Sequence, residues 1–81
     1  MILDPVVVRM IDLTWYNKSG RAAKFYRLEI IPGLFGDWSL VHHWGNIDEA
    51  GETRTEWFKT ETQAKQARFV AHMEKAMAGY E

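Results

Sequence analysis

The chain has 81 residues, of which 47% are hydrophobic and 26% are charged, and these proportions exclude a disordered or fibrous protein. Because it contains no cysteine, a disulfide framework, a thiolate metal site and a cysteine nucleophile are also excluded. The net charge of -1 provides no overall attraction to nucleic acid or to an anionic membrane, so any such binding depends on a local patch.

The N-terminal segment, MILDPVVVRMIDL, carries Asp4, Pro5, Arg9 and Asp12 within an apolar run. It lacks the basic start and the small-residue cleavage site of a secretory signal peptide. No segment approaches the roughly 20 consecutive apolar residues of a membrane helix. We therefore expect a soluble cytoplasmic protein that does not bind membranes and that forms a single domain over residues 1–81.

The first half of the chain predicts two strands joined by a turn. Residues 6–15 are rich in β-branched side chains and predict the first strand, while residues 17–21 have the composition of a turn. Residues 23–31 alternate between apolar and polar side chains and predict a second strand with one buried side. The predicted buried face carries Tyr26, Leu28 and Ile30.

Two more strands follow. The loop Leu34-Phe35-Gly36 would expose two large apolar side chains unless they pack over the edge of the sheet. Residues 37–44 alternate again and predict a third strand, and the half-polar residues 53–59 predict a fourth, with a turn over residues 45–51 between them. One face of the third strand is expected to carry Trp38, Leu40, His42 and Trp44.

The last part of the chain predicts one helix. Thr60 and Gln63 have the spacing of a capping box, in which each side chain bonds the backbone N–H of the other, and Gly79 suits the position after the helix. The apolar face is predicted to consist of Ala64, Ala67, Val70, Ala71, Met77 and Ala78. Short connections make the sheet antiparallel, so we predict an α+β fold, with four or slightly more strands and the C-terminal helix packed across one face.

Several short motifs occur in the order and spacing of a known family. They are Lys24-Phe25-Tyr26, Leu34-Phe35-Gly36, Trp38-Ser39-Leu40-Val41, Trp44-Gly45, Ile47, Gly51, Thr53, Phe58, Ala64, Lys75 and Gly79-Tyr80. Over residues 15–80 the chain resembles the WGR domain family, in particular its stand-alone bacterial branch, which is related to the WGR module of poly(ADP-ribose) polymerases. The resemblance implies the fold predicted above and a non-catalytic module that binds DNA near strand breaks.

Trp44 and Gly45 match the first two residues of the Trp-Gly-Arg motif for which the family is named. In the polymerases the motif tryptophan packs on a terminal sugar, and nearby basic residues contact phosphate. Asn46 occupies the third position, where an amide lacks the charge and the forked geometry of arginine. The next residues, Ile47-Asp48, depart from the usual Ile-Gly, and carboxylates nearby repel phosphate. The acidic residues that follow are Glu49, Glu52 and Glu56.

The resemblance and the basic residues together suggest a nucleic-acid-binding site. Its candidate residues are Trp44, Gly45, Asn46, Lys24, Arg27, Arg54 and His43. Trp44 has two interpretations, because its ring either contacts a sugar or base or fills the edge of the sheet. The basic run also has two interpretations: it forms either a phosphate-binding stripe beside Trp44 or a solvated hairpin. Its residues are Lys18, Arg21, Lys24 and Arg27.

Other functions have less support. Adjacent strand residues point to opposite faces, so His42 and His43 are not expected to chelate a metal together, and no cofactor is expected. The chain lacks a glycine-rich phosphate loop and a nucleophile with a recognisable base, which predicts no enzyme activity and no small-molecule substrate. A protein-interaction module that kept the fold and lost DNA binding is the alternative function. Its surface would use aromatic residues, of which the candidates are Trp15, Phe35, Trp38 and Trp57.

Overall fold

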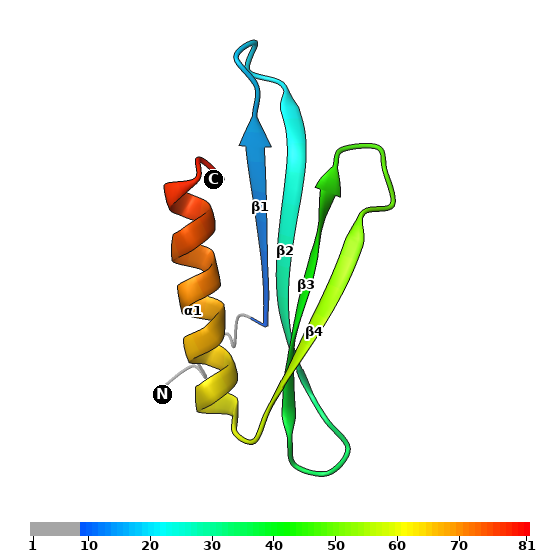
Figure 1. Ribbon diagram of the computed structural model, residues 1–81, viewed down its shortest axis with the longest axis vertical. Helices are drawn as coiled ribbons and strands as arrows, with labels where there is room; N and C mark the ends of the chain where they lie inside the picture. The colour runs from blue at the N-terminus through cyan, green and yellow to red at the C-terminus, as the bar shows by residue number, and fades with distance from the viewer. Residues whose placement is uncertain (1–8) are drawn as a thin grey trace, which may run out of the picture.

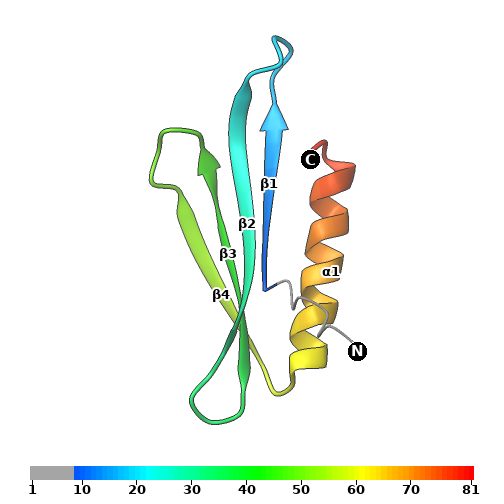
Figure 2. The ribbon, with the colours of Figure 1, turned by 180° about the vertical axis from the view of Figure 1, so that it is seen from behind.

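A computed structural model describes residues 9–81 and contains four strands followed by one helix (Figure 1). The strands form one antiparallel sheet in the order β1-β2-β3-β4, so each strand pairs with its neighbour in sequence. Figure 2 shows from behind that β1 and β4 are the two outer strands. The elements are β1 (Met10–Tyr16), β2 (Ala22–Pro32), β3 (Trp38–Asn46), β4 (Glu52–Phe58) and α1 (Glu61–Met77).

The predicted α+β fold is confirmed. The strands predicted at 23–31, 37–44 and 53–59 differ from β2, β3 and β4 by no more than two residues at either end. The first strand was predicted to begin at residue 6, and its residues 6–8 lie outside the described part of the chain. Within the described part, β1 begins at Met10.

The helix packs on the face of the sheet that the alternation predicts to be buried. On this face Leu13 is paired with Tyr26 and Leu28 with His42, and α1 contacts β2, β3 and β4. Leu28 and Leu40 are completely buried, and burial of a leucine side chain contributes about 1.5–3 kcal/mol to stability. The buried apolar residues are Leu13, Tyr26, Leu28, Ile30, Leu40, Ala64 and Ala71.

The predicted apolar face of the helix is partly wrong. Val70 is 57% exposed and Met77 is 85% exposed, and Ala78 is exposed as well. Ala64 and Ala71 are buried as predicted, and Ala67 packs against the core. The contact face then continues to Lys75, whose ammonium lies 4.6 Å from the centre of the Tyr26 ring. Since the aliphatic stem of lysine covers apolar surface while its charge rests on an aromatic ring, a cation occupies a position where apolar patterning expects a hydrophobic residue.

Both ends of the helix have specific caps. Thr60 Oγ1 accepts a hydrogen bond from the Gln63 N–H at 3.1 Å, as the capping box predicts. The return bond differs, because Gln63 Oε1 accepts from the N–H of Lys59, one residue earlier than predicted. At the other end Gly79 has φ 100° and Tyr80 N–H donates to the Lys75 carbonyl, which is a Schellman motif.

The loop between β2 and β3 does not pack over the sheet. Leu34 is 93% exposed and Phe35 is 92% exposed at the tip of this hairpin. Gly36, with φ 82°, turns the chain back toward β3. The two apolar side chains therefore lie in solvent at the end of the sheet where β3 begins.

Hydrogen bonds link three polar side chains at the core, those of Tyr26, His42 and Glu56. His42 is 2% exposed, and its Nδ1 lies 2.7 Å from the Tyr26 hydroxyl while its Nε2 lies 2.7 Å from Glu56 Oε1. A carboxylate only accepts, so Nε2–H donates to Glu56, and the other ring nitrogen, Nδ1, bonds the Tyr26 hydroxyl. Burial raises the pKa of the Tyr26 phenol above its ordinary value, although Arg54 opposes the shift. The phenol therefore remains a donor throughout the physiological pH range.

Replacing Tyr26 with phenylalanine should lower the free energy of unfolding by about 1–3 kcal/mol, because His42 Nδ1 would stay buried without its partner. Urea unfolding followed by tryptophan fluorescence measures this difference. Tyr16→Phe is the matched control, since Tyr16 is 45% exposed in β1 and should change stability by less than about 0.5 kcal/mol. Equal stability of the two variants would contradict a buried, satisfied Tyr26 hydroxyl.

Candidate nucleic-acid interface

The end of the sheet opposite the Leu34-Phe35 loop contains a hollow of about 410 Å³, referred to below as the Trp44 hollow. Its walls come from β2, the end of β3, the turn before β4, the start of β4 and the segment after the helix. They include four of the seven residues that the sequence suggests for nucleic-acid binding. The lining residues are Lys24, Trp44, Gly45, Asn46, Glu49, Gly51, Glu52 and Tyr80.

Trp44 both packs against the core and lines the Trp44 hollow. Its ring stacks on Tyr26, with 5.7 Å between the ring centres and 18° between the planes, and it packs against the core. It is only half-buried, however, and its remaining surface lines the hollow. The ring is therefore a rigid wall, since its orientation is set by the core rather than by a ligand.

The amide and the ammonium in the Trp44 hollow already have partners. Asn46 Nδ2 donates to Glu49 Oε1 at 3.2 Å, so the amide that takes the place of the motif arginine is occupied by a carboxylate of the same turn. The Lys24 ammonium lies 5.4 Å from the centre of the Trp15 ring. The charged lining residues are two acids, Glu49 and Glu52, and one base, Lys24, so the hollow carries more negative than positive charge.

Three predicted site residues do not line the Trp44 hollow. Arg27 lies on the opposite face of β2, where its Nε bonds Asp12 Oδ1 at 2.7 Å, and this bond raises the pKa of the guanidinium. His43 also points to that face and bonds the Ala50 carbonyl through Nε2 at 2.8 Å. Arg54 is on the helix-covered face, but its Nη1 lies 3.6 Å from Glu56 Oε2.

The predicted basic stripe is not continuous. Lys18 lies in the turn between β1 and β2, and Arg21 directly precedes β2. Lys24 and Arg27 are three residues apart in a strand, so their side chains leave opposite faces of the sheet. The same alternation separates His42 from His43, as expected from the sequence: His42 is in the core and His43 contacts Phe25 on the other face.

Tyr80 is a lining residue that the sequence did not identify as functional. It follows Gly79, and the Schellman motif at Gly79 turns the chain so that the Tyr80 ring meets Tyr26 edge to face at 6.2 Å. Glu81 then exchanges two backbone hydrogen bonds of 2.8 Å with Thr14 of β1. A glycine at the C′ position was the signal that the following residue returns to the core.

Gly45 and Gly51 explain how the turn approaches β3 so closely. A Cβ on Gly45 would lie 2.7 Å from the Gly51 Cα, and one on Gly51 would overlap the Trp44 carbonyl oxygen. Gly51 also has φ 79°, a conformation that side chains disfavour. The two glycines thus let the turn that carries Asn46 and Glu49 fold back beside Trp44.

Two further observations concern the described residues 9–81. No helix among them has the length and apolar composition required to cross a membrane. No three histidine, aspartate or glutamate side chains in this range are grouped so as to hold a metal ion. The lining of the Trp44 hollow offers aromatic faces, one ammonium, one side-chain amide and two carboxylates.

A family model described as the WGR domain matches residues 10–81, which include every strand, the helix and the Trp44 hollow. Comparison with curated proteins gives no significant match, and neither does comparison with solved structures.

Replacing Gly51 with alanine should destabilise the protein more than replacing Gly20, although both have φ near 80°. An alanine at Gly20 meets no atom within 4 Å and should cost about 1–2 kcal/mol for its backbone conformation alone. At Gly51 the overlap with Trp44 adds a further cost of about 1–3 kcal/mol. Thermal unfolding of the two variants measures the difference, and equal melting temperatures would contradict the close approach at this turn.

Proposed function

The chain belongs to the WGR domain family, and we propose that it is a non-catalytic module that binds nucleic acid through the Trp44 hollow. The observation that carries the proposal is the gathering of Lys24, Trp44, Gly45 and Asn46 in one hollow. Trp44 and Gly45 are the residues that match the family motif, and the family resemblance implies recognition of DNA ends or nicks.

The aromatic walls suit the end of a strand. A terminal nucleotide exposes one face of its base and one edge of its sugar, which an internal nucleotide buries against its neighbour. Trp44, held against Tyr26, offers a flat surface beside Tyr80. Stacking of a base on an aromatic ring contributes about 1–3 kcal/mol, and a ring already fixed by the core loses little entropy when it binds.

The phosphate contribution is expected to be small. Lys24 is the one cationic side chain among the lining residues, and Glu49 and Glu52 oppose it. Each phosphate contact changes the slope of log K against log salt concentration by about -0.9. One such contact predicts a shallow salt dependence and weak binding, with a dissociation constant of roughly 10–100 µM at moderate salt.

A protein partner is the second candidate function. The carboxylates of the Trp44 hollow disfavour phosphate, and the Leu34-Phe35 loop presents two almost fully exposed apolar side chains at the other end of the sheet. Aromatic side chains such as Phe35 are enriched at protein interfaces. Such a partner would bind with little dependence on salt and would require Phe35 rather than Lys24.

Replacing Lys24 with glutamine should weaken binding to a nicked DNA duplex and reduce the salt slope by about one. Fluorescence anisotropy of a labelled duplex at several salt concentrations measures both quantities. Lys65→Gln is the matched control, because it removes the same charge from the helix surface, away from the Trp44 hollow. Equal slopes for the two variants would mean that Lys24 contacts no phosphate.

Restoring the motif arginine should strengthen binding. Asn46→Arg combined with Glu49→Gln supplies a guanidinium and removes the carboxylate that now accepts from Asn46, so the affinity should rise about tenfold. The control Gln66→Arg with Glu61→Gln makes the same change in charge on the helix. If both double variants gain equally, the effect is one of net charge and the Trp44 hollow is not the binding site.

A further inference from the structure

The two outer strands of the sheet differ in the backbone hydrogen bonds along their outer edges. The edge of β1 is partly occupied, because Thr14 exchanges two backbone hydrogen bonds with Glu81, and its register shifts between Trp15 and Tyr16. β4 pairs with β3 over seven residue pairs without any shift. Among the described residues, no backbone hydrogen bond beyond the β3 ladder reaches β4, which is an outer strand of the sheet (Figures 1 and 2).

An unpaired, regular edge of this kind is a template for another strand. Edge strands of monomeric proteins are usually short or protected by proline, by a bulge or by charges that repel a second copy. β4, with the sequence ETRTEWF, has neither a proline nor a bulge. It does carry charges, and their arrangement decides which strand the edge accepts.

The charges of β4 are complementary to those of the same strand in reverse. If two copies pair antiparallel about Thr55, Arg54 of each lies opposite Glu56 of the other. Thr55 then faces Thr55 of the second copy, and Thr53 faces Trp57. Directly opposite charges and aromatic or threonine pairs each contribute roughly 0.2–1 kcal/mol in an antiparallel sheet, whereas like charges destabilise it.

We propose that the chain forms a symmetric dimer in which two copies of β4 pair antiparallel about Thr55. The two four-stranded sheets then become one continuous sheet, with both helices on the same side. The twofold axis passes beside Thr55, so the same surface is used by both copies and the assembly closes at two.

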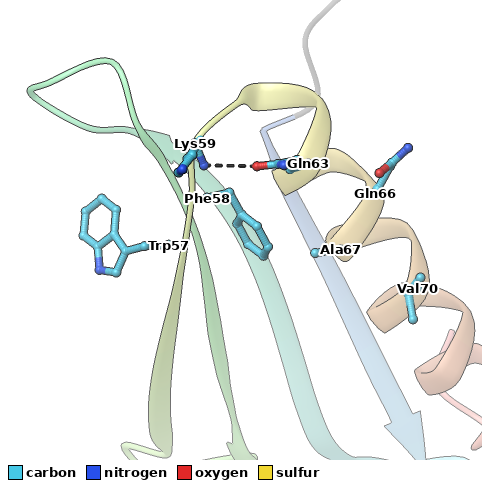
Figure 3. A pocket seen from close by; sticks show the side chains of 7 residues that line it. All are labelled: Trp57, Phe58, Lys59, Gln63, Gln66, Ala67 and Val70. Carbon is cyan, nitrogen blue, oxygen red and sulfur yellow. Dashed lines mark hydrogen bonds between the residues drawn. The ribbon is translucent and has the colours of Figure 1, made fainter.

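The groove beside β4 is consistent with this arrangement. It has a volume of about 580 Å³ and lies between β4 and the first half of α1. Figure 3 shows Phe58 directed toward Ala67 of the helix, whereas Trp57 points to the other side of the strand. A second β4 would border this groove and cover part of Val70, which is 57% exposed, as well as the 62% exposed Trp57.

The association is expected to be moderate. Seven paired residues form a smaller interface than the roughly 800 Å² per partner of a standard complex. We therefore expect a dissociation constant of roughly 10–100 µM. This range is accessible to sedimentation equilibrium.

A charge at the twofold axis tests the proposal. Thr55 is exposed, so Thr55→Lys and Thr55→Glu should fold normally, but each places like charges opposite one another. Wild-type protein should sediment as a concentration-dependent dimer, and either variant alone as a monomer. An equimolar mixture of the two variants should again form dimers, while the control Thr62→Lys on the helix should behave as wild type.

Two results would overturn the proposal. One is a wild-type protein that remains monomeric up to about 500 µM, well above the expected dissociation constant. The other is a dimer that persists in Thr55→Lys, which would place the contact elsewhere, for example on the exposed Phe69 and Met73 of the helix.

A crosslink gives a second, independent measurement. The chain contains no cysteine, so Thr55→Cys introduces a single thiol. Directly opposite residues of an antiparallel pair lie close enough for a disulfide, and mild oxidation should yield a covalent dimer. The control Thr62→Cys should crosslink much more slowly, and equal rates for the two variants would count against pairing at β4.

Discussion

The packing around Tyr26 is the constraint on which the rest of the structure depends. Its ring stacks on Trp44 and meets Tyr80 edge to face, its hydroxyl bonds buried His42, and the ammonium of Lys75 rests on its face. One residue in the middle of the sheet therefore holds the end of β3, the end of the helix and the segment that follows it. The Trp44 hollow exists because these three parts meet at this ring.

The shape of the Trp44 hollow and its charge depend on different parts of the chain. The aromatic walls belong to the core, so their positions change only if the fold changes. The carboxylates and the amide belong to the turn after β3, which Gly45 and Gly51 allow to lie close to Trp44. The fold thus fixes the aromatic walls of the proposed site, while the residues of one turn set its charge.

The periodicity of the sequence was sufficient to predict the strands, the buried side of the sheet and the helix, because the strands alternate and the helix ends carry capping residues. The apolar face of the helix was predicted only in part, since Val70 and Met77 are exposed. It could not show that Lys75 packs on Tyr26, since binary patterning assigns lysine to the surface. The alternation of side chains along β2 is enough to place Lys24 and Arg27 on opposite faces of the sheet. The bond between Asn46 and Glu49 depends on the turn geometry, which apolar patterning does not encode.

We propose that the Trp44 hollow receives the end of a nucleic-acid strand. A nuclear magnetic resonance titration of the isotope-labelled protein with a nicked duplex and with an intact circular duplex tests this proposal. The signals of the Trp44 indole and of the Lys24, Asn46 and Tyr80 amides should shift with the nicked duplex and shift less with the intact one. Shifts confined to other surfaces, or equal shifts with both duplexes, would contradict it.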